Sequence, residues 1–67
     1  MALRLLIYRL IGGGLATCLE TTDGQGVVVA QQWMGYRGDG EPQRMDGPLR
    51  DRIGPIRVVD FPDEGSP

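Results

Sequence analysis

The tetrapeptide Thr-Asp-Gly-Gln at residues 22–25 separates two apolar runs, 15–19 and 27–29. An Asp-Gly pair readily supplies the positive φ angles that a two-residue hairpin turn needs. The segment before it alternates with a period of two and contains β-branched threonines, while the segment after it contains a valine run. We therefore expect an antiparallel hairpin around this turn, and we expect Gly24→Val to lower its stability.

Residues 2–11 fit two kinds of secondary structure. Their apolar side chains match an i, i+3, i+4, i+7 helical stripe that Gly12 would end, and they also fall on both faces of an alternating strand. No N-cap residue precedes the segment, and a helix of this length has little intrinsic stability. These observations favour a strand that is covered on both sides. A helix packed on a three-stranded sheet is the alternative.

The second half of the chain is punctuated by glycine and proline. Residues 34–52 predict a long loop because they contain many turn-forming residues. Residues 53–61 predict a last strand, in which Pro55 indicates an edge position or a start at Ile56. The final residues, 62–67, predict a mobile acidic tail.

Together these segments predict one small, mainly β domain over residues 1–61. Its architecture is expected to be an antiparallel sheet of about four strands, or a partly open barrel, with one long loop; the α+β arrangement is the alternative. A chain of 67 residues lies near the lower size at which a hydrophobic core alone keeps a protein folded. Self-association or docking on a larger partner would add buried area. The strands are expected near residues 2–11, 15–22, 26–33 and 53–61, with the loop at 34–52.

The composition excludes several kinds of active site within one chain. The sequence has no histidine and a single cysteine, Cys18, so it lacks the usual zinc ligand sets, an intrachain disulfide and any Cys-His or Ser-His pair. Cys18 is expected to be a small buried hydrophobe. The loop carboxylates suit solvated surface charge better than calcium ligation. We expect no catalytic residue, metal or cofactor, and no enzymatic activity.

The charge balance bears on the possible partners. All seven basic residues are arginine, and with nine acidic residues they give a net charge of −2, which disfavours general polyanion binding. The N-terminal apolar run is a poor match to a signal peptide or a membrane-spanning segment, because Arg9 and the glycines at 12–14 interrupt it. We expect a cytoplasmic protein without a membrane partner.

Aromatic and arginine side chains gather around the predicted loop. These residue types are enriched at protein interfaces, because they bury large areas while keeping a polar handle. Trp33 also suits a core position at the end of its strand, and the arginines also suit a solvated surface. The predicted partner-binding residues are Trp33, Tyr36, Arg37, Arg44, Arg50 and Arg52.

The function favoured by these observations is that of a non-enzymatic protein-interaction module. It would be a small accessory subunit or a partner-directed inhibitor, which binds another protein or a second copy of itself by surface occlusion or edge-strand addition. The alternative is a small nucleic-acid-binding barrel, whose aromatic and arginine side chains would stack on bases and contact phosphates. The acidic net charge disfavours this alternative.

Overall fold

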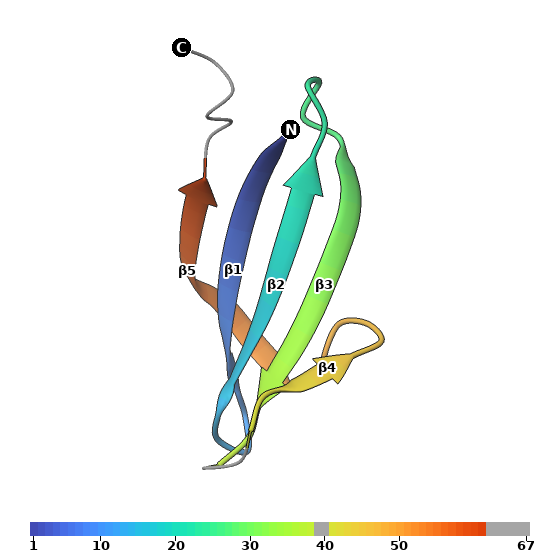
Figure 1. Ribbon diagram of the computed structural model, residues 1–67. Helices are drawn as coiled ribbons and strands as arrows, with labels where there is room; N and C mark the ends of the chain where they lie inside the picture. The colour runs from blue at the N-terminus through green and yellow to red at the C-terminus, as the bar shows by residue number, and fades with distance from the viewer. Residues whose placement is uncertain (39–40, 62–67) are drawn as a thin grey trace.

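The computed structural model describes residues 1–38 and 41–61, which form one antiparallel sheet (Figure 1). The strands lie in the order β4-β3-β2-β1-β5, so β2 is central and β4 and β5 form the edges. The sheet is open and does not close into a barrel, and the expectation of a mainly β fold is confirmed. The strands are β1 (Ala2–Leu10), β2 (Leu15–Thr22), β3 (Val28–Tyr36), β4 (Gln43–Met45) and β5 (Arg52–Phe61).

The N-terminal segment is a strand, and the helical alternative for residues 2–11 is wrong. β1 pairs with β2 along one side and with β5 along the other, so that Leu5 lies between Leu19 and Val59. Two neighbouring strands satisfy the backbone N–H and C=O groups of β1, which a short, uncapped helix would leave partly unpaired.

The hairpin of β2 and β3 is confirmed, but its turn is wider than a two-residue turn. The Asp23 amide donates to the Val27 carbonyl oxygen at 2.9 Å. The Asp23 carboxylate accepts hydrogen bonds from the amides of Gln25 (2.8 Å) and Val27 (3.0 Å). The positive φ falls at Gly26 (83°) and not at Gly24. The Asp23 side chain therefore organises a longer turn. Because Gly24 lacks a positive φ, the reason for expecting Gly24→Val to lower the stability of the hairpin no longer applies.

The region expected to be a loop, residues 34–52, contains regular structure. β3 continues to Tyr36, and β4 pairs with it in the register Trp33 to Met45 and Gly35 to Gln43. This fifth strand was missed because three residues are too short to show a period of two. The predicted tail, 62–67, lies outside the described residues.

β5 is an edge strand, as Pro55 indicated. It begins at Arg52, earlier than expected, and its register with β1 shifts between Ile7 and Arg9. Figure 1 shows that β5 changes direction along its length. Its first residues consequently reach across the end of the sheet towards β3 and β4, while Arg57 and the residues after it continue along β1.

The hydrophobic core lies on one side of the sheet, which we call the core face. The cross-strand pairs of Cys18 with Leu6 and Trp33 place these side chains on the same face. The segment between β4 and β5 packs over this face, because a Cβ atom on Gly35 would lie 3.3 Å from Leu49 Cδ2. The buried cluster consists of Tyr8, Leu10, Ala16, Cys18, Trp33 and Leu49, with Leu6 and Met45 partly buried against it.

Candidate interaction surface

Trp33 is a core residue, with 7% of its surface exposed. Its ring centroid lies 5.7 Å from that of Tyr8, and the two planes are tilted by 31°. Arg52 covers both rings, with its guanidinium carbon 5.4 Å from the Trp33 centroid and 5.6 Å from the Tyr8 centroid. Its burial and the overlying Arg52 therefore restrict a partner's access to Trp33.

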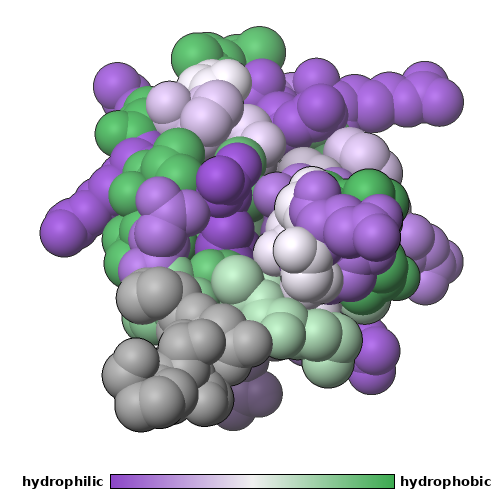
Figure 2. All heavy atoms as spheres, turned by 90° about the horizontal axis from the view of Figure 1, so that it is seen from above, coloured by the Kyte–Doolittle hydropathy of each residue, from purple (hydrophilic) through white to green (hydrophobic). Residues whose placement is uncertain are grey.

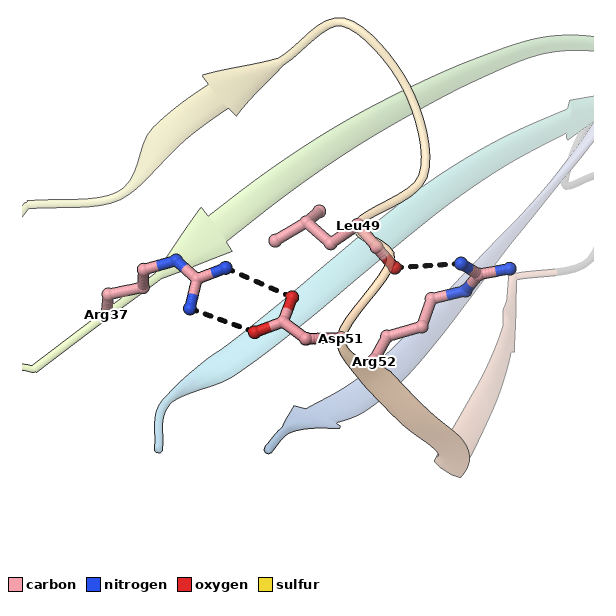
Figure 3. Close-up of polar contacts among 4 residues, drawn as sticks. All are labelled: Arg37, Leu49, Asp51 and Arg52. Atoms are coloured by element: carbon pink, nitrogen blue, oxygen red, sulfur yellow. Dashed lines mark hydrogen bonds and ion pairs between the residues drawn. The ribbon is translucent and has the colours of Figure 1, made fainter. Parts of the chain in front are cut away.

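Two arginines bind the segment between β4 and β5, which crosses the core face (Figure 3). Arg37 at the end of β3 donates two hydrogen bonds of 3.1 Å to the Asp51 carboxylate. These bonds lower the pKa of Asp51 and raise that of Arg37. Arg52 donates a 2.8 Å hydrogen bond to the Leu49 carbonyl oxygen. The two arginines therefore bind groups of the chain itself: Arg37 binds the Asp51 carboxylate, and Arg52 binds the Leu49 carbonyl oxygen.

The structure separates the six predicted partner-binding residues. Trp33 and Arg52 belong to the core face, Arg37 is paired with Asp51, and Arg50 is exposed in the crossing segment. The remaining two share the other side of the sheet. Tyr36 pairs with Leu15, and Arg44 pairs with Met34. Whether any of the six contacts a partner stays a prediction.

The side of the sheet opposite the core face, which we call the open face, is apolar along its central strands. Leu5 pairs with Leu19 and Val59, and Leu3 pairs with Phe61. Paired residues in an antiparallel sheet point to the same side, so these side chains form a continuous surface. Its large hydrophobic members are Leu3, Leu5, Ile7, Leu15, Leu19, Met34, Tyr36, Ile53, Val59 and Phe61.

No buried cluster forms on the open face within the described part of the chain. Leu3, Leu15 and Phe61 keep 41%, 42% and 45% of their surface exposed. Leu5, Leu19 and Val59, at the centre of the surface, are half-buried. Seen end-on, the molecule shows hydrophobic atoms at its surface on the side where β5 lies, interrupted by polar ones (Figure 2). A contiguous apolar surface of this kind is uncommon on a monomeric protein.

The charges on the strands are divided between the two faces. Arg9, Arg44 and Arg57 point to the open face, since they pair with Leu15, Met34 and Ile7. The acidic strand residues point the other way: Glu20 accepts from Gln31 at 2.9 Å, and Asp60 pairs with Arg4 at 2.9 Å on the same side as the core. Among the described strand residues the open face thus carries three arginines and no carboxylate.

Two residues of the predicted set, Tyr36 and Arg44, lie on the open face, whereas its aliphatic centre was not among the predicted residues. The available signal was the apolar pattern on both faces of residues 2–11, which predicted a strand covered on both sides. The structure covers β1 on the core face and leaves Leu3, Leu5 and Ile7 uncovered by any buried cluster of the described chain. The structure therefore bears out the covered side for the core face only.

The described residues contain no group of three or more His, Cys, Asp or Glu side chains able to hold a metal ion. Cys18 is a free, buried thiol whose pKa is raised, mainly by burial and also by the charge of Glu20, so it is protonated at neutral pH. A surface pocket of about 480 Å³ lies beside Arg37, Glu41 and Gln43, where the Arg37 guanidinium is already bound to Asp51.

Comparison with protein-family models, curated proteins and solved structures found no match to this chain. Among the described residues there is also no helix long and apolar enough to cross a membrane.

Proposed function

We propose that this chain is a non-enzymatic protein-interaction module, a small accessory subunit or a partner-directed inhibitor, which docks through its open face. The observation that carries the proposal is the apolar surface centred on Leu5, which no described segment buries. Extended exposed apolar surfaces on soluble domains mark sites of association.

The energetics of the fold support docking. Full burial of one Leu, Ile or Val side chain contributes about 1.5–3 kcal/mol, and the open face offers several that are only half-buried. Among the described residues, the buried cluster of the core face has six members. A partner on the open face would therefore add apolar burial to the small core of this 67-residue chain.

The proposal keeps part of the residue set predicted from the sequence. Tyr36 and Arg44 lie on the open face and remain candidate partner contacts. Trp33 and Arg52 are assigned to stability, because they pack against each other on the core face. Nucleic-acid binding stays the alternative: the open face carries Tyr36 and three arginines, but its aliphatic centre lacks the aromatic or guanidinium planes on which bases stack.

Two adjacent valines of β5 provide a matched test. Val59 pairs with Leu5 on the open face, whereas Val58 pairs with Leu6 on the core face and is 46% exposed. We expect Val59→Glu to abolish capture of a specific protein from the native host, detected by mass spectrometry. Val58→Glu, which introduces the same charge one residue away, should leave capture intact. Equal capture by the wild type and Val59→Glu would overturn the proposal.

A further inference from the structure

The arginines of the open face are the only ones on the strands that lack a role within the described chain. Arg4 binds Asp60 and Arg52 stacks on the core rings. Arg9, Arg44 and Arg57 make no ion pair or hydrogen bond to any described residue. Guanidinium groups recognise carboxylates through paired hydrogen bonds, so three of them around an apolar centre select a partner by charge as well as by shape.

Two of these arginines stand at opposite ends of one row across the sheet. The row runs Arg57, Ile7, Thr17, Met34, Arg44, one residue from each strand. Four inter-strand spacings separate its ends by about 19 Å along the sheet. An α-helix with its side chains is about 10–12 Å wide, so one helix fits between the two arginines and its flanks come within reach of their long side chains.

The open face is also long enough for such a helix. From Leu3 to Arg9 the strand β1 advances by about 20 Å, which corresponds to about 13 helical residues, or between three and four turns. A helix of this length carries an apolar stripe at i, i+3, i+4 and i+7 that can cover Leu3, Leu5 and Ile7.

We infer that the open face binds an amphipathic helix of a partner protein whose apolar stripe is flanked by carboxylates; this inference rests on the proposed function. Apolar contacts to the β1 and β2 side chains provide affinity, and the carboxylates pair with Arg9, Arg44 and Arg57. The dependence of binding on salt separates the two components, because ion pairs at the rim weaken as the salt concentration rises while apolar contacts persist.

Two other occupants fit the same face less well. A second copy packed face to face would bring six guanidinium groups together, because each copy contributes three arginines and no strand carboxylate. An anionic membrane would have to accept the hydroxyls and amide of Thr17, Thr21 and Gln32, which also point to this face. Such groups lose their hydrogen bonds in hydrocarbon, whereas a protein can provide partners for them.

The test uses the full chain and two helical peptides of about 16 residues with the same leucine stripe, one flanked by glutamate and one by lysine. We expect the glutamate peptide to bind at least about tenfold more tightly by titration calorimetry. The triple variant Arg9→Gln/Arg44→Gln/Arg57→Gln should lose this preference. Arg50→Gln, which removes an exposed arginine from the crossing segment, should retain it.

Several outcomes would overturn the inference. These are equal binding of the two peptides, no binding of either, or a preference that survives in the triple variant. A concentration-dependent dimer in light scattering would assign the face to a second copy, and flotation with phosphatidylserine vesicles would assign it to a membrane. In either case the result should be sensitive to Val59→Glu but not to Val58→Glu. If both peptides fail while Val59-dependent capture of a host protein persists, the proposed function stands and the helix is wrong.

Discussion

The guanidinium carbon of Arg52 lies 5.4 Å from the ring centroid of Trp33, and the same group donates a hydrogen bond to the Leu49 carbonyl oxygen. Arg52 therefore connects the largest side chain of the core to the backbone of the segment that crosses it. Its side chain remains in contact with solvent while its plane covers the aromatic rings, an arrangement that a lysine ammonium reproduces poorly.

Replacing Arg52 should destabilise the fold. Arg52→Ala removes the contacts with Trp33 and Tyr8 and leaves the Leu49 carbonyl without its donor, so we expect a loss of about 1–2 kcal/mol in the free energy of unfolding. Urea denaturation followed by tryptophan fluorescence measures it. Arg50→Ala is the control and should stay within about 0.5 kcal/mol. Equal effects of the two substitutions would show that Arg52 contributes only surface charge.

Glycine is required at position 14 and not at position 24. Gly14 has a φ of 102°, and a Cβ atom there would overlap the Tyr36 carbonyl oxygen. Gly14→Ala should therefore cost about 2 kcal/mol or more in the free energy of unfolding. Gly24 lacks a positive φ, and a Cβ on it would meet nothing within 4 Å.

Gly24→Ala is accordingly the matched control for the turn variants. It should change the urea midpoint little, because the Asp23 carboxylate and Gly26 shape that turn. A larger loss for Gly24→Ala than for Gly14→Ala would contradict the turn geometry described above.

Burial of Cys18 makes the stability of the fold decrease at alkaline pH. Its pKa is raised above the ordinary value of 9.0, mainly by desolvation, so the folded state holds the thiol proton more tightly than the unfolded state. This contribution to stability is complete below pH 9.0 and is lost as the pH rises through the folded pKa. Urea midpoints measured from pH 7 to pH 10.5 should fall more steeply for the wild type than for Cys18→Ala. Parallel profiles would contradict burial of the thiol.

The ion pair of Asp51 with Arg37 makes the stability of the fold decrease at acidic pH. Its hydrogen bonds with Arg37 hold its pKa below the ordinary value of 3.8. The stabilisation is therefore present above pH 3.8 and is lost as the pH falls through the lower folded pKa. Asp51→Asn and Arg37→Gln should each flatten the decline of the urea midpoint between pH 6 and pH 2. The double variant should add nothing further, and an additive effect would show that the two residues act separately.

The sequence predicted the strands because their signals are local. Alternation over residues 15–22 and the valine run after the turn depend only on a period of two, and both segments form strands of one hairpin. β4 was not predicted because three residues are too short to show a period of two, and what defines it is its pairing with β3. The turn at Asp23 was misjudged because its shape depends on side-chain hydrogen bonds to Gln25 and Val27.

The candidate surface was harder to predict than the fold. Which face of β1 is covered depends on where the segment bearing Leu49 crosses the sheet, and that path is set by contacts distant in sequence. Trp33 is the plainest example: its residue type suits a core and an interface equally, and only the register with Cys18 places it on the core face. The positions of Arg9 and Arg57 on the open face likewise follow from their pairing with Leu15 and Ile7, which the sequence alone does not give.

Trp33 and Tyr36 should separate stability from recognition. Trp33→Ala empties the centre of the core face and should cost about 3–5 kcal/mol, a large share of the stability of a small domain. Tyr36→Ala removes a half-buried side chain from the open face, so it should cost about 1 kcal/mol while weakening capture of the host partner. Circular dichroism in urea and the capture assay provide the two measurements. If Tyr36→Ala binds normally, and Trp33→Ala stays folded but loses binding, the interaction surface lies on the core face.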